Sequence, residues 1–293
     1  MPSGERAPAG PGGAARREEA PAVPTGERAL VVLDLADASP GTLEQALAVS
    51  RYEAELLARR GGLRLHRVLD RAAAETEALR LGALGLAVVV VSEAEARARP
   101  RRCLGGERGS RRLDLRTEEG RVTLRRGDVL LVVRGPIARE YAPSPKRRRI
   151  DTARLAEGYR VHLHLRAVSP ASPPVGALPR PVEIDAGNFE FGIAVTGSAR
   201  LELDAWVEEV ASGAPSDDGF RRLPPALGPA EAEAKGALSA ASSLSLASRG
   251  GETASDGGPI LLDNVEQFRF YSGWRAAVER RRQAHSPARA APC

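Results

Sequence analysis

Two histidines that alternate with aliphatic residues are the side chains of this sequence best suited to chemistry. His162 and His164 lie in the segment YRVHLHLRAV, and residues two apart share one face of a β-strand. Glu183 and Asp185 repeat that spacing in the segment PVEID. Two imidazoles and two carboxylates on neighbouring strands could bind a divalent metal, which would polarise a substrate and lower the pKa of a bound water. This pattern favours a metal-dependent hydrolase.

The aliphatic residues of the same segments favour a different interpretation. They are Val161, Leu163 and Leu165 in the first segment, and Val182 and Ile184 in the second. If these side chains face the core, the histidines and carboxylates point to water and pair with one another there. We therefore expect the histidines to be exposed, with no polar pocket and no cofactor, and the metal site remains the alternative.

A basic run is the next candidate site. It lies between prolines in the stretch PSPKRRR and could bind a phosphate, an acidic lipid headgroup or nucleic acid. No aromatic residue except Tyr141 lies near it, so stacking on single-stranded bases is poorly supported. We expect a solvated surface loop, and phosphate or nucleic-acid contact is the further alternative. The residues concerned are Lys146, Arg147, Arg148 and Arg149.

Two smaller features have simple explanations. Cys103 follows two arginines that could lower its pKa, but no histidine is near it in sequence, so we expect an incidental cysteine in a linker. The triplet Asp217-Asp218-Gly219 resembles part of a calcium loop but lacks the spaced acidic ligands, so it predicts a turn. The chain also lacks the motifs GxGxxG, GxxxxGK[ST], GxSxG and HExxH, which argues against the enzyme classes that carry them.

Composition places the chain among ordinary globular proteins. It has 293 residues, enough for one large or two small domains, and a formal net charge of only +5. Only Lys146 and Lys235 are lysines among 43 basic residues, a bias typical of a GC-rich bacterial genome, so nucleic-acid binding is not favoured. The two cysteines fit a reducing compartment, and neither a signal peptide nor a membrane span is expected. We expect a cytoplasmic protein.

The first ordered segment predicts a small β-α-α-β-α-β domain. The apolar runs ALVVLDL, LRLHRVL and LAVVVVSE read as strands. Ser39 before Pro40, and Ser50 three residues before Glu53, are signals for the start of two helices, and a third follows Asp70.

This order of elements resembles the C-terminal domain of the large-subunit ribosomal stalk protein. The likeness rests on the Glu53-Ala54 step before the second strand and on the run from Glu77 to Leu79 in the helix that ends at Gly85. It covers roughly residues 29–93. The resemblance implies the same fold and a helical face presented to protein partners.

The next segments predict a second, β-rich domain. RRLDLRT, GRVTLRR and DVLLVVRG are strands at hairpin spacing, and YRVHLHLRAV, PVEID and NFEF follow them. RLELDAWVEEVAS then reads as a closing helix with Leu203, Trp206, Val207 and Val210 on one face. Several antiparallel strands closed by one helix look like a pleckstrin-homology-like barrel.

A last amphipathic helix follows a polar linker and carries an apolar stripe that is too hydrophobic to stay in water. We expect this helix to dock on the second domain, or else to bind a partner. Its stripe consists of Val265, Phe268, Phe270, Trp274 and Val278.

The whole chain is therefore predicted to be α+β. The predicted parts are a disordered tail over 1–27, the first domain over 28–94, a linker over 95–110, the β-rich domain over 111–212, a disordered linker over 213–258, the amphipathic helix over 259–284 and a tail over 285–293. The missing motifs favour a non-enzymatic protein-interaction or regulatory module with an unidentified protein partner.

Overall fold

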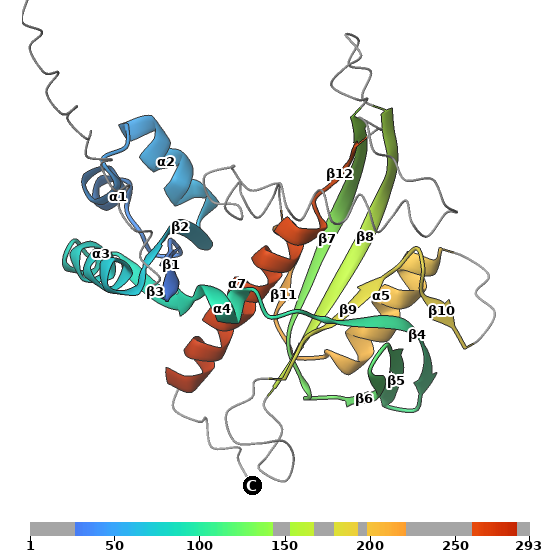
Figure 1. Cartoon of the computed structure of the whole chain (residues 1–293). Helices are drawn as coiled ribbons and strands as arrows, with labels where there is room; N and C mark the ends of the chain where they lie inside the picture. Colours follow the sequence, from blue (N-terminus) through green and yellow to red (C-terminus); the bar gives the residue numbers. More distant parts are fainter. Residues whose placement is uncertain (1–26, 143–152, 167–178, 193–197, 221–259, 286–293) are drawn as a thin grey trace, which may run out of the picture.

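The computed structural model describes residues 27–142, 153–166, 179–192, 198–220 and 260–285. The chain is α+β, as predicted, and its long C-terminal helix lies between two sheets (Figure 1). Most of the predicted tails and of the predicted linker over 213–258 lie outside the described residues. The described start of that linker is not disordered as predicted, because Ser216–Asp217 forms a strand and Phe220 is buried.

The first unit has the predicted β-α-α-β-α-β order. Its three strands form an antiparallel sheet in the order β2-β1-β3. The predicted capping box is present, because the Ser50 side chain accepts from the Glu53 amide while the Glu53 carboxylate accepts from the Ser50 amide. The elements are β1 (Arg28–Asp34), α1 (Pro40–Leu47), α2 (Arg51–Arg60), β2 (Leu63–Asp70), α3 (Arg71–Ala83) and β3 (Ala87–Ser92).

The central strand β1 is buried on both faces. Val31 and Leu33 pack against helices α1, α2 and α3. Leu30 and Val32 point the other way and pack against the C-terminal helix. A continuous apolar run is what such a strand requires, because neither of its faces meets water.

The second unit is one large mixed sheet in the order β11-β7-β8-β9-β4-β5-β6. The prediction of antiparallel strands holds for most pairs, but β9 and β10 pair with β4 in parallel, and β11 pairs with β7 in parallel. The elements are α4 (Glu93–Ala96), β4 (Arg101–Gly109), β5 (Arg112–Thr117), β6 (Gly120–Arg125), β7 (Val129–Ala142), β8 (Ala153–Leu165), β9 (Val182–Asp185), β10 (Glu190–Phe191), α5 (Ala199–Val210) and β11 (Ser216–Asp217).

The predicted linker over 95–110 is wrong, since most of it forms the strand β4 inside the sheet. This strand pairs with β5 on one edge and with β9 and then β10 on the other. Its glycines suggested a linker, but they are needed for packing. A Cβ on Gly105 would lie 2.3 Å from the Glu190 carbonyl oxygen, so only glycine lets β10 approach this closely.

Two helices cover the two faces of the large sheet. Helix α5 packs on one face, where its buried Trp206 joins the core around Val161 and Leu163 of β8. The C-terminal helix α7 (Val265–His285) covers the opposite face, and the short strand β12 (Ile260–Asp263) before it pairs with β7.

Helix α7 docks on both units, whereas the sequence predicted docking on the second one alone. Val265 and Phe268 pack with Phe220 against β7. Phe270, Trp274 and Val278 pack against the sheet of the first unit; all members of the predicted stripe are thus buried. The helix therefore joins the two units through a hydrophobic contact on each side.

Two glycines allow α7 to lie this close to its neighbours. A Cβ on Gly273 would lie 1.9 Å from the Ala96 carbonyl oxygen at the end of α4. A Cβ on Gly135 of β7 would lie 2.8 Å from the ring of Phe268. Both distances are well inside van der Waals contact, so any larger residue at either position must displace the helix.

We predict that Gly273→Ala lowers the free energy of unfolding by about 1–3 kcal/mol, because the added methyl group collides with the backbone of α4. On helix propensity alone, the same change would stabilise the protein by up to about 1 kcal/mol. Urea unfolding measures the difference.

Gly82→Ala in α3 is the matched control, because a Cβ at this helical position has no neighbour within 4 Å. It should be neutral or stabilising. If Gly273→Ala stabilised the protein as much as Gly82→Ala, α7 would not pack on α4 in this way.

Candidate functional site

His162 and His164 are buried, so the prediction that they face solvent is wrong. Each side chain is only 1% exposed. The alternation of β8 was interpreted correctly, since Val161 and Leu163 do face the core under α5. The opposite face, however, lies under α7 and not in water, and the polar residues of β8 and β9 are enclosed there.

Ser272 of α7 connects the two histidines. Its Oγ lies 2.9 Å from Nδ1 of His162 and 2.7 Å from Nε2 of His164. Nε2 of His162 lies 3.0 Å from Oε2 of Glu183 on the neighbouring strand, where the two residues are direct cross-strand partners. The edge of the His162 ring also packs on Phe268, with 4.7 Å between ring centroids.

Glu183 is the anionic centre of this network. Arg269 of α7 donates to both carboxylate oxygens of Glu183 at 2.7 Å. This bidentate pair binds the helix to β9, in addition to the contacts of Ser272 with β8. Arg160 of β8 donates to Glu183 at 3.3 Å and reaches Asp185 at 3.0 Å. Asp185 also accepts from the Asn188 side chain at 2.7 Å. We call the set His162, His164, Glu183, Arg269 and Ser272 the α7 network.

The hydrogen bonds are consistent with neutral histidines. A carboxylate only accepts, so Nε2 of His162 carries a proton and Nδ1 accepts from the Ser272 hydroxyl. The Ser272 oxygen then accepts from Nε2 of His164, whose Nδ1 has no hydrogen-bond partner among the described residues.

Burial is the main cause of the pKa shifts at this site. It lowers the pKa of His162, against the opposing effect of the hydrogen bond to Glu183. It holds the pKa of His164 well below the usual value, and the nearby His162 and Arg280 act in the same direction. Burial alone would raise the pKa of Glu183, but the hydrogen bonds from Arg269 and His162 outweigh it and keep that pKa far below its usual range.

The connection from Ser272 through His162 to Glu183 has the residue types of a hydrolytic triad. A triad needs a nucleophile that a substrate can reach and whose lone pairs are available for attack. Ser272 is 0% exposed, and its oxygen is shared between two imidazoles under a packed helix. In this conformation the group therefore holds α7 in place and has no access to substrate.

The predicted metal ligands come together only in part. His162 and Glu183 are in contact, but the carboxylate is occupied by Arg269, and Asp185 pairs with Arg160. Within the described ranges, no group of three His, Cys, Asp or Glu side chains could hold a metal ion.

The other predicted sites have varied outcomes. The basic run Lys146 to Arg149 lies outside the described residues, so its role stays a prediction. Cys103 is buried in the core under α5, where burial raises the pKa of its thiol to about 11, which contradicts a reactive thiolate. Asp217 ends the strand β11 where a turn was predicted; its carboxylate accepts from the Gly219 amide at 2.7 Å and from Tyr271 and Arg275 of α7.

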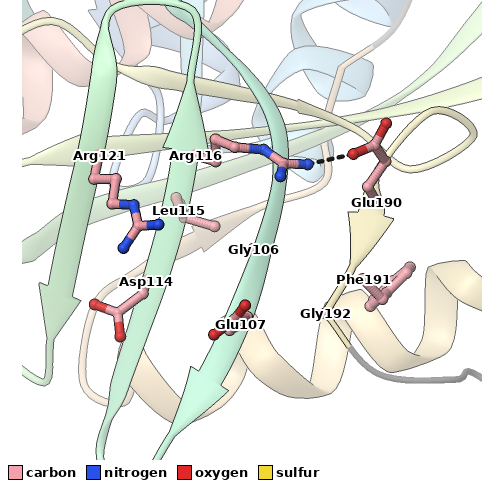
Figure 2. A pocket seen from close by; sticks show the side chains of 9 residues that line it. All are labelled: Gly106, Glu107, Asp114, Leu115, Arg116, Arg121, Glu190, Phe191 and Gly192. Atoms are coloured by element: carbon pink, nitrogen blue, oxygen red, sulfur yellow. Dashed lines mark hydrogen bonds and ion pairs between the residues drawn. The ribbon is translucent and has the colours of Figure 1, made fainter.

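A shallow pocket of about 220 Å³ lies away from the α7 network, at the strands β4, β5 and β6 (Figure 2). Its walls carry side chains of both charges: Arg116, Arg121, Glu107, Asp114 and Glu190. Arg116 pairs with Glu190 across its rim. The pocket contains no histidine, cysteine or serine, and of its three carboxylates Glu190 is already paired with Arg116.

Comparison with known proteins found no match. No family model, no curated protein and no solved structure is significantly similar to this chain. None of the helices in the described ranges is long and apolar enough to cross a membrane.

Sequence reasoning missed Ser272, Arg269 and Arg160 as partners of the histidines. One signal was available: Arg269 and Ser272 are three residues apart on a helix and therefore share one face. A polar face on the helix matches the polar face of β8 and β9. The residue pattern alone does not show that these two faces meet.

We predict that the free energy of unfolding falls as the pH drops below about 6.5, the pKa of histidine in an unfolded chain. The folded-state pKa of His162 and of His164 is lowered, so below that pH the unfolded chain binds more protons. The slope should reach at most about 1.4 kcal/mol per pH unit for each histidine. Urea unfolding between about pH 7.5 and pH 5 measures this loss.

The double variant His162→Gln/His164→Gln is the control. It should be less stable at neutral pH but have a flatter pH profile, with a residual slope from His66, whose pKa is also lowered by burial. A slope equal to that of the unaltered protein would show that the buried histidines do not cause the acid sensitivity.

Proposed function

We propose that this protein is a non-enzymatic protein-interaction or regulatory module in which α7 fixes two binding units in one orientation. The observation that supports this proposal is that the side chains able to do chemistry hold α7 in place instead. Ser272, His162 and Glu183 could do chemistry in a pocket, yet here they bind the helix that joins the units. A catalytic site needs at least one such group free to meet a substrate.

The outward helices of the first unit supply a candidate contact surface. Tyr52 at the start of α2 is 71% exposed, and Leu79 of α3 is 77% exposed. Arg80, next to Leu79, donates to the Ala46 carbonyl near the end of α1, which holds the last turn of α3 beside α1. Exposed apolar side chains on the outward helices are candidate contacts for a protein partner. The resemblance to the ribosomal stalk domain implies the same use of a helical face.

The metal-dependent hydrolase remains the alternative from the sequence, but no contact at the site favours it. A metal ion would have to displace the bidentate Arg269 from Glu183, which would leave Arg269 only its pair with Glu266.

Site-specific photo-crosslinking in the source organism tests the proposal. A photoreactive amino acid at Tyr52 or at Leu79 should yield an adduct with one and the same protein. The matched control is Leu201 of α5, which is 70% exposed on the other unit and should not yield that adduct. The purified partner should then bind the full chain and lose affinity for Tyr52→Ala.

Elemental analysis of the purified chain is the measurement that can contradict the proposal. Stoichiometric zinc or manganese that disappears in His164→Ala would overturn the proposal in favour of the hydrolase. The absence of any common adduct from Tyr52 and Leu79 would also count against it.

A further inference from the structure

The strand β6 ends the large sheet and offers a free edge. It pairs with β5 on one side, and no strand within the described ranges pairs with its other side. At the end of β6, the Arg125 N–H already donates to the Asp128 carboxylate and its C=O accepts from the Asp128 amide. The rest of that edge, from Arg121 to Leu124, is open to hydrogen bonds from another strand. Proteins use such edges to bind extended peptides by strand addition.

The exposed face beside this edge places like charges opposite each other. Arg112 lies opposite Arg125, and Arg116 lies opposite Arg121 in the register of β5 and β6. Direct cross-strand pairs of like charge destabilise a sheet. Two such pairs next to each other lower the stability of the sheet. Local features that lower stability are found mostly at functional sites.

In each pair, the arginine on β5 forms an ion pair with a carboxylate, whereas the arginine on β6 does not. Arg112 pairs with Asp114 at 2.9 Å, and Arg116 pairs with Glu190. Arg121 and Arg125 are exposed and make no side-chain ion pair with any described residue. In Figure 2, the Arg121 side chain extends from β6 over the face of the hairpin toward Asp114 of β5, away from the Arg116–Glu190 pair.

The opposite face of β6 is apolar. Leu124 is buried in the core under α5, and Val122 packs partly against the same core. A strand added at this edge would therefore have its apolar side chains next to Val122 and Leu124. Its alternate side chains would lie next to Arg121 and Arg125.

We propose that the free edge of β6 binds an extended acidic protein segment as an additional strand. The segment would alternate acidic and apolar residues, so that carboxylates meet Arg121 and Arg125 while aliphatic side chains extend the core. This inference deepens the proposed interaction function and rests on it.

Charge decides between the possible occupants of this edge. A second copy of the chain would place the arginines of two β6 strands close together, and like charges repel. Nucleic acid would find no aromatic residue in β6 for base stacking. An acidic peptide strand avoids both penalties.

The experiment uses the full-length chain and a fluorescent synthetic peptide with the core Glu-Val-Thr-Val-Glu. Binding is measured by fluorescence anisotropy. Arg121→Glu/Arg125→Glu should weaken it at least about tenfold. Arg59→Glu/Arg64→Glu, an equal charge change at exposed arginines of the first unit, should leave it unchanged.

Two further measurements test the backbone pairing. Peptides methylated on alternate amide nitrogens should fall into two classes, one that binds and one that does not, because only alternate amides of a strand face its partner. Hydrogen exchange should show slower exchange within residues 120–125 when the peptide is bound.

Several results would overturn the inference: no peptide binding, equal binding of a peptide with lysines in place of the glutamates, or single-stranded DNA competing for the edge. If the peptide fails while crosslinks from Tyr52 still identify a partner, the interaction function stands and only the β6 edge is excluded.

Discussion

The bidentate ion pair between Arg269 and Glu183 is the contact on which the arrangement of this protein depends. It joins α7 to the middle of the large sheet, and Ser272 binds both histidines one helical turn further along. A buried carboxylate is tolerated only when its hydrogen bonds are satisfied, and α7, which covers Glu183, also supplies the Arg269 donors that keep it charged. The aromatic residues on the other side of α7 then hold the first unit against the same helix.

This contact explains why residues typical of an active site are found in the interior. A packed helix–sheet interface made only of aliphatic residues would allow α7 to slide or rotate by a turn. Hydrogen bonds between specific polar groups fix one register, as buried polar residues do in some coiled coils. Here Ser272 can contact both imidazoles in one position of the helix, and Gly273 can face Ala96 in the same position.

The sequence predicted what depends on short-range patterns. The element order of the first unit, the capping box at Ser50, the closing helix α5 and the apolar stripe of α7 all follow from periodicity and capping. The failures concern pairing at long range. The strand β4 was taken for a linker, because its glycines are explained only by the approach of β10. The faces of His162 and Glu183 were assigned to water, because alternation separates two faces but does not show whether a distant helix covers the second one.

A double-mutant cycle on the free energy of unfolding tests the central contact most directly. Arg269→Gln and Glu183→Gln are measured alone and together by urea unfolding at neutral pH. Because each residue is the other's main charged partner, the two losses should not add, and the coupling should exceed about 1 kcal/mol. Additive losses, with a coupling near zero, would mean that the pair does not hold α7 to the sheet.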